Sequence, residues 1–139
     1  MAKQTNLYLS KGFAAAGATL TSADTTAWKT IYTASADDAT IKALSCCSTD
    51  TAAVNLRLGV DIAGAVYQIG CVNVPIAAGT NGTAPSVDLL SPAALPFLAV
   101  DRNGKRVLSL KAGNILKVAA LATMTAAKTL TVVALPEEF

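Results

Sequence analysis

Apolar residues alternate with polar or small ones in the segment AVNLRLGVD, residues 53–61. Val54, Leu56, Leu58 and Val60 fall on one side of an extended chain, and the residues between them fall on the other. This spacing is typical of an antiparallel strand with one face in the core and one face in water. Weaker versions recur along the chain, separated by Gly, Asn, Asp and Pro. The sequence therefore predicts an all-β protein.

Further strands are predicted by the same pattern. They cover residues 27–33, 40–48, 65–74, 87–90, 107–111, 115–121 and 129–135. The strongest hairpin signal is Asp101–Lys105, because its Asn-Gly pair readily takes positive φ. Ser91 followed by Pro92 predicts one helical turn. Strands this short and this regularly spaced indicate a sandwich or a barrel.

One segment is ambiguous. Residues 114–128 contain Ala and Leu, which favour a helix, and Asn114 is a suitable N-cap. The threonines in the segment and the strands on both sides favour β-structure. We expect strands there, with a helix as the alternative.

Length and composition bound the organisation. With 139 residues we expect a single domain, residues 13–139, preceded by a polar N-terminal arm, residues 1–12. Only 14% of the residues are charged and 53% are apolar. Soluble domains average about 25% charged residues, so we expect a partner to cover part of the surface. No apolar run is long enough to span a membrane, and residues 1–12 are too polar for a secretory signal. Assembly in a cytoplasm is expected.

The chain has three cysteines, Cys46, Cys47 and Cys71. Their number is odd and they lack CxxC spacing, so we expect small buried hydrophobic side chains rather than redox centres. A metal site is not expected, because the chain has no histidine to complete a ligand set. In the strand 65–74, the alternation puts Tyr67, Ile69 and Cys71 on one face.

Catalytic motifs are absent from the sequence. Without histidine, the Ser/His and Cys/His pairs cannot form. The only adjacent acids, Asp37 and Asp38, lie in a predicted turn, where Asp is favoured for its hydrogen bonds to the backbone. Neither a phosphate loop nor a dinucleotide fingerprint occurs. We therefore expect neither an enzyme nor a cofactor.

Charge is distributed unevenly. Residues 102–136 hold six basic side chains, no acidic side chain and no aromatic ring, so nucleic-acid binding is not expected. If the basic residues share one face, that face can dock on an acidic partner. The alternative is that scattered lysines keep a sheet soluble and protect its edges.

The aromatic residues suggest a second class of function. Trp28, Tyr32, Tyr67 and Phe97 would form a sugar-stacking patch if they lay together on the surface. Carbohydrate binding is therefore an alternative function. Aromatic residues that alternate along a strand more often belong to the core.

The order of the segments resembles a known family. The opening TAWKTIYTASADDATIKALSCCSTD (residues 25–50), the strand VNLRLGVD (54–61), the ALPFL segment (94–98), the KAGNILKV box (111–118) and the ending PEEF (136–139) together resemble head-decoration, or cement, proteins of tailed phages. The resemblance covers residues 25–139. With carbohydrate binding, the alternative is a carbohydrate-binding receptor module of a phage tail or fibre.

This resemblance implies a fold, a location and a partner. It implies a jelly-roll-like antiparallel β-sandwich of about eight short strands. It also implies a virion protein on the capsid exterior that binds the major capsid protein and itself, as a homodimer or a trimer. Three contact segments are expected: the arm, the basic hairpin and the acidic end. Their residues are Lys3, Asn6, Leu7, Tyr8, Arg102, Lys105, Arg106, Glu137, Glu138 and Phe139.

Overall fold

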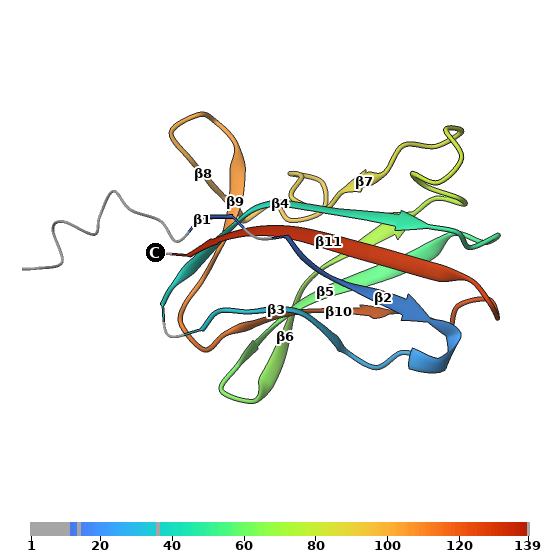
Figure 1. Cartoon of the computed structure of the whole chain (residues 1–139), viewed down its shortest axis with the longest axis horizontal. Coiled ribbons are helices and arrows are strands. Elements are labelled where there is room, and N and C mark those ends of the chain that lie inside the picture. Colours follow the sequence, from blue (N-terminus) through green and yellow to red (C-terminus); the bar gives the residue numbers. More distant parts are fainter. Residues whose placement is uncertain (1–11, 14, 36, 139) are drawn as a thin grey trace, which may run out of the picture.

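The computed structural model describes residues 12–13, 15–35 and 37–138 (Figure 1). These residues form strands and one short 3-10 helix, η1. The bounds are β1 (Gly12–Phe13), β2 (Ala16–Thr21), η1 (Ser22–Asp24), β3 (Lys29–Thr33), β4 (Ala39–Ser48), β5 (Val54–Ile62), β6 (Ala65–Val74), β7 (Val87–Asp88), β8 (Ala99–Val100), β9 (Arg106–Leu110), β10 (Ile115–Ala120) and β11 (Thr129–Glu138). The expected all-β class is confirmed.

Two antiparallel sheets form a β-sandwich. In the first sheet, β11 lies between β2 and β4, and the far side of β4 is shared by β7 and β9. The second sheet has the order β3-β10-β5-β6. Successive strands thus alternate between the sheets from β2 to β5 and again from β9 to β11, while β5 and β6 form a hairpin in the middle. This is the strand order of a jelly roll.

The core lies between the two sheets. Along β5 the even-numbered residues from Val54 to Val60 are at most 8% exposed, as the alternation predicts. Side chains of β4, β10 and β11 face them from the same interior. Leucines dominate the fully buried set, which includes Leu20, Leu44, Leu56, Leu58, Leu116 and Leu130.

A β-bulge in β6 changes the faces of that strand. Leu58 pairs with Gly70 and Gly59 pairs with Gln68, so Ile69 is the extra residue. Beyond the bulge the alternation is inverted, and Cys71 shares a face with Arg57 instead of with Tyr67. The expectation that Tyr67, Ile69 and Cys71 share one face was therefore wrong.

The other local predictions concern residues 114–128, the hairpin, the turn at Ser91 and the last strand. Residues 114–128 form β10 and turns, so the helical alternative was wrong. The hairpin at Asp101–Lys105 is confirmed, with Gly104 at φ 78°. Ser91 caps a single turn, accepting the amide of Ala94 at its hydroxyl and the amide of Leu95 at its carbonyl. The last strand extends beyond Leu135 to Glu138, because a bulge accommodates Pro136.

The cysteines differ from one another. Cys46 is buried, and burial, with the neighbouring Cys47 thiol, raises its pKa to about 12. Cys47 is half-buried and Cys71 is exposed, so a buried role was wrong for Cys71. Among the described residues, no group of His, Cys, Asp and Glu is arranged to hold a metal ion, and no helix is long and apolar enough to cross a membrane.

Candidate partner-binding surface

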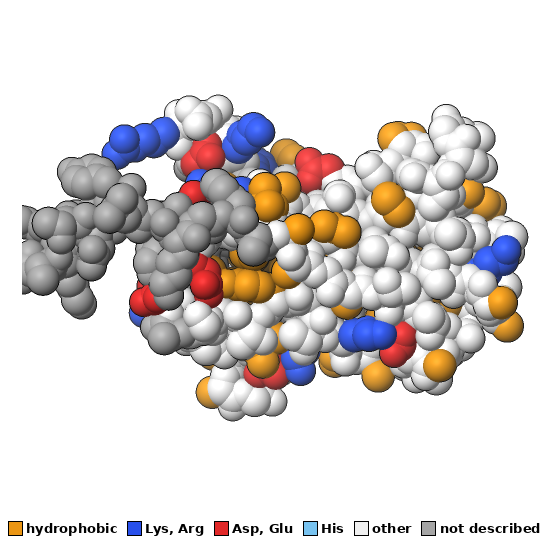
Figure 2. Space-filling model, in the orientation of Figure 1, with side chains coloured by type: hydrophobic (Ala, Val, Ile, Leu, Met, Phe, Trp, Pro, Cys, Tyr) orange, Lys and Arg blue, Asp and Glu red, His pale blue; other side chains and the backbone are white. Residues whose placement is uncertain are grey.

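The basic hairpin and the acidic end of the chain lie at the same end of the sandwich (Figure 1). The hairpin joins β8 to β9, and β9 pairs with the first residues of β4. The last residues of β11 pair with the same part of β4, and Glu138 also faces Gly12 of β1. The first described residues therefore lie next to the acidic end. Figure 2 shows basic and acidic side chains gathered around the hairpin. We call this region the charged end.

Lys42 links the two predicted segments. Its ammonium lies 4.0 Å from the Asp101 carboxylate in the hairpin and 4.0 Å from the Glu137 carboxylate in β11. All three side chains are less than one-third exposed. Lys42 was not singled out from the sequence, because nothing in its neighbourhood along the chain indicates contact with residues so distant.

Asp101 fixes the conformation of the hairpin. Its carboxylate accepts the backbone amides of Asn103 and Lys105, each at 2.9 Å. Hydrogen bonds from these amides, led by that of Lys105, hold the pKa of Asp101 below its ordinary value, together with the charges of Lys42 and Lys105 and against a smaller effect of burial. Asp101 therefore stays ionised and the turn keeps its shape.

The three basic residues of the hairpin have different roles. The Arg106 guanidinium donates to the carbonyls of Leu98 at 3.2 Å and Pro96 at 3.5 Å, so it holds the neighbouring loop in place. Arg102 and Lys105 are exposed. Of the three, these two side chains are the ones that face solvent.

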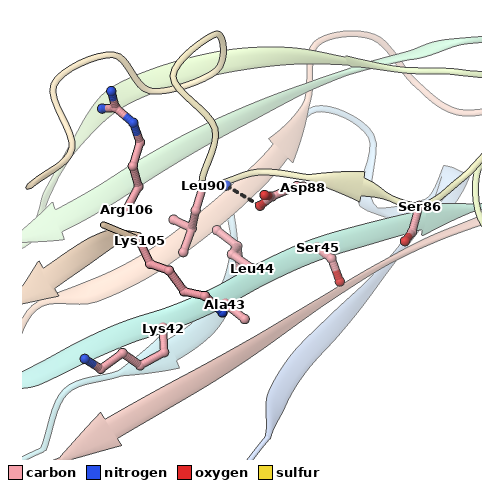
Figure 3. Close-up of a pocket in the computed structure, with 9 residues that line it drawn as sticks. All are labelled: Lys42, Ala43, Leu44, Ser45, Ser86, Asp88, Leu90, Lys105 and Arg106. Carbon is pink, nitrogen blue, oxygen red and sulfur yellow. Dashed lines mark hydrogen bonds between the residues drawn. The ribbon is translucent and has the colours of Figure 1, made fainter. Parts of the chain in front are cut away.

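A shallow depression of about 440 Å³ opens beside the hairpin (Figure 3). It lies over residues 42–45 of β4. The pairing of β4 with β9 ends at Ile41, and its pairing with β7 begins at Ser45. Lys42, Lys105 and Arg106 bring three positive charges to its wall and Asp88 brings one negative charge. Hydroxyls of Ser45 and Ser86 complete the polar lining. An acidic or carbonyl-rich segment of another chain fits this chemistry.

The acidic end is part of the sheet. Glu138 accepts a hydrogen bond from the Ser35 hydroxyl at 2.8 Å. Tyr32 also lies close: burial first, and then the neighbouring Glu138 carboxylate, raise the pKa of Tyr32 to about 12. The carboxylates of Glu137 and Glu138 thus already interact within the protein, and their roles as partner contacts stay predictions. Lys3, Asn6, Leu7, Tyr8 and Phe139 lie outside the described residues, and their contact roles stay predictions.

Lys117 and Lys128 do not share one face with the hairpin. Lys117 projects from the outer face of the second sheet, where it pairs with Asp61 at 3.2 Å. Lys128 precedes the first residue of β11, and the charged end lies at the last. At about 3.3 Å per residue, these positions are about 30 Å apart. The basic residues of positions 102–136 therefore do not all share a single face.

The four candidate sugar-stacking residues do not form one patch. Trp28 packs against Gly59 on the outer face of the second sheet, with the Arg57 guanidinium 4.7 Å from its ring centre. Tyr67 pairs with Val60, whose side chain belongs to the core, so Tyr67 lies on the opposite face. The stacking hypothesis is therefore wrong for the set as a whole.

One buried carboxylate needs separate consideration as a catalytic candidate. Asp50 is 1% exposed, and its oxygens accept the Thr125 hydroxyl at 2.6 Å, the Thr125 amide at 3.1 Å and the Ala52 amide at 3.0 Å. Burial acts to raise the pKa of Asp50, but these hydrogen bonds outweigh it and the pKa is lowered. The carboxylate ties the end of β4 to the loop before β11, which is a structural role.

No known family model and no curated protein matches the chain. A solved structure described as "Cyanophage Pam1 capsid asymmetric unit" is similar to it, with a TM-score of 0.48 and 14% sequence identity. The similarity covers 95% of this chain and 87% of the solved chain.

Proposed function

We propose that this protein is a virion structural protein that binds the outside of a phage capsid and stabilises contacts between major capsid protein subunits. The proposal starts from the sequence resemblance across residues 25–139. The observation that carries it is the charged end, where the hairpin and the end of β11 come together around Lys42 and where β1 pairs with the end of β11.

The charged end has the properties of a docking surface. Its hairpin is held rigid by Asp101 and Arg106, so little conformational entropy is lost when a partner binds. Exposed Arg102 and Lys105 favour a partner surface with acidic side chains or free carbonyls. On a symmetric shell many copies bind at once, so each contact can be modest.

The test uses heads assembled from the major capsid protein encoded in the same genome, without this chain. The purified full chain is added, and two quantities are measured: the amount that sediments with the heads, and the temperature at which the heads disrupt. We expect saturable binding and a higher disruption temperature. Heads that neither retain the protein nor gain heat resistance would overturn the proposal.

Charge variants test the surface itself. Lys105→Glu reverses a charge at the charged end and should weaken binding about tenfold or more. Lys128→Glu makes the same change at the opposite end of β11 and should leave binding unchanged. Equal binding by the two variants would remove the charged end from the proposal. Glycan binding that is lost in Trp28→Ala, without unfolding, would favour the receptor-module alternative.

A further inference from the structure

We infer that the edge strand β6 is a self-association surface, through which two copies of this chain pair antiparallel around a two-fold axis. The inference is independent of the charged end and of capsid binding. It rests on the backbone, the composition and the exposure of β6 (Ala65–Val74).

β6 has a free backbone edge. It is the last strand of the second sheet and pairs only with β5. Among the described residues, no other segment forms backbone hydrogen bonds with residues 65–74. An edge strand of ten residues therefore presents a row of unpaired amides and carbonyls, which is a template for another strand.

The opposite edge of the same sheet is protected. β3 has only five residues and begins with Lys29. The Lys29 ammonium donates to the Thr19 carbonyl at 2.6 Å and pairs with Asp24 at 3.3 Å, so the neighbouring β2 and η1 cover this edge. Short length, a lysine and a covering segment are the usual devices that prevent edge pairing. β6 has none of them, since its sequence AVYQIGCVNV contains no charged residue and no proline.

The surroundings of β6 limit where a partner can sit. Leu95 and Ala94 cover the core side of the strand, so close to Gly70 that a Cβ there would lie 2.6 Å from the Leu95 side chain. The free surface is therefore the edge itself, the outer face and the hairpin end. At the hairpin end, Tyr67 at 58% and Ile62 at 46% are exposed apolar side chains on the same side of the sheet as Val60.

A second copy is the occupant that fits this composition. In a two-fold pair, each residue of β6 faces a residue of the same uncharged strand, so no like charges meet. A strand with many charged residues would find no opposite charge along β6. Pairing of β6 with β6 of the second copy joins two sheets of four strands into one continuous sheet of eight.

A depression of about 220 Å³ beside the edge supports this placement. It is lined by Cys71, Val72 and Asn73 of β6 together with residues of β7 and the segment 91–94. Side chains of a strand added at this edge have room there. The pairing also places the exposed Cys71 within the interface, which supplies a reporter.

The first test measures the mass of the isolated full chain in solution. Sedimentation equilibrium should give about twice the 14.1 kDa of one chain. Tyr67→Lys combined with Gln68→Lys places like charges across the two-fold axis and should give the single-chain mass. Thr30→Lys combined with Thr33→Lys puts the same charges on the β3 edge and should stay dimeric.

The second test follows the Cys71 thiol in the unmodified protein. Its alkylation rate, quantified by mass spectrometry, should fall at least tenfold as the concentration rises through the dimer dissociation constant. A single-chain mass at every soluble concentration would overturn the inference. So would a dimer in which the β6 lysines have no effect or Cys71 stays equally reactive. None of these measurements involves a capsid, so capsid binding and self-association can fail separately.

Discussion

The charged end and the β6 edge differ in almost every property that governs association. The charged end gathers Lys42, Asp101, Glu137, Lys105 and Arg106 around a fixed hairpin. The β6 edge carries no charge over ten residues. The difference shows that one jelly roll can present two surfaces that use different physical interactions. Contacts at the first depend on charge complementarity, whereas contacts at the second depend on backbone hydrogen bonds and apolar area.

The largest loss of stability should come from a substitution at Leu95, in the segment that connects the two surfaces. Leu95 is 0% exposed and covers Gly70 of β6, and the Leu98 carbonyl three residues later accepts Arg106 of the hairpin. Leu95→Ala should lower the free energy of unfolding by about 2–5 kcal/mol, since it leaves a cavity in the core. Denaturant unfolding measures this loss.

Pro92→Ala is the matched control for that variant, because Pro92 is an exposed residue of the same segment. It should change the free energy of unfolding by less than about 0.5 kcal/mol. Equal losses in the two variants would mean that Leu95 does not anchor the segment.

Ionic strength should affect association at the two surfaces differently. Raising the salt concentration from about 0.05 M to about 0.5 M shortens the screening length several-fold. Binding to heads through the charged end should weaken about tenfold. Dimerisation through β6 should change less than about twofold, because the strand has no charge to screen. Sedimentation at both salt concentrations measures both, and a dimer that dissociates in salt contradicts the assignment to β6.

The strands could be predicted because their causes are local. The alternation in residues 54–61 and the turn residues Asn103 and Gly104 act within a few positions, and the predicted strand 65–74 matches β6 at both ends. The bulge at Ile69 was missed, because a shift in register depends on the partner strand. The consequence was a wrong face, and a wrong burial, for Cys71.

The candidate site was predictable only in pieces. The hairpin and the acidic end were visible as charged segments, but their joint contact with Lys42 depends on the pairing of β4 with both β9 and β11. The contact of Asp50 with Thr125 joins residues that are 75 positions apart, and nothing near either residue indicates it. Both contacts are set by the tertiary structure, and local sequence patterns do not reveal them.

Acid should loosen the charged end while β6 keeps its structure. The pKa of Asp101 is lowered in the folded protein, so its contribution to stability is present above the ordinary value of 3.8 and is lost as the pH falls through the lowered value. As the pH falls through this lowered pKa, the amides of Asn103 and Lys105 should lose protection against exchange, relative to the intrinsic rate at each pH.

Hydrogen exchange at pH 7 and at pH 3, compared residue by residue, measures this. Asp101→Asn is the control, and its hairpin should exchange at nearly the same rate at both pH values after correction for intrinsic exchange. β6 has no carboxylate, so its amides should keep their protection as long as the fold persists. Acid-induced exchange in β6 that matches the hairpin would show a global opening rather than a local one.

The smallest expected loss of stability is that of a substitution at Lys42, which links the hairpin to β11. Lys42→Met removes both ion pairs, but the lysine is 31% exposed and each contact is 4.0 Å long. The free energy of unfolding should therefore fall by less than about 1 kcal/mol. Lys117→Met is the matched comparison, because its 3.2 Å partner Asp61 is only 9% exposed. A buried carboxylate that loses its cation is costlier, so Lys117→Met should destabilise more.

Binding to heads gives a separate measure of Lys42. If Lys42→Met weakens this binding as much as Lys105→Glu does, while the free energy of unfolding barely changes, then Lys42 holds the hairpin in its binding position and does not stabilise the fold.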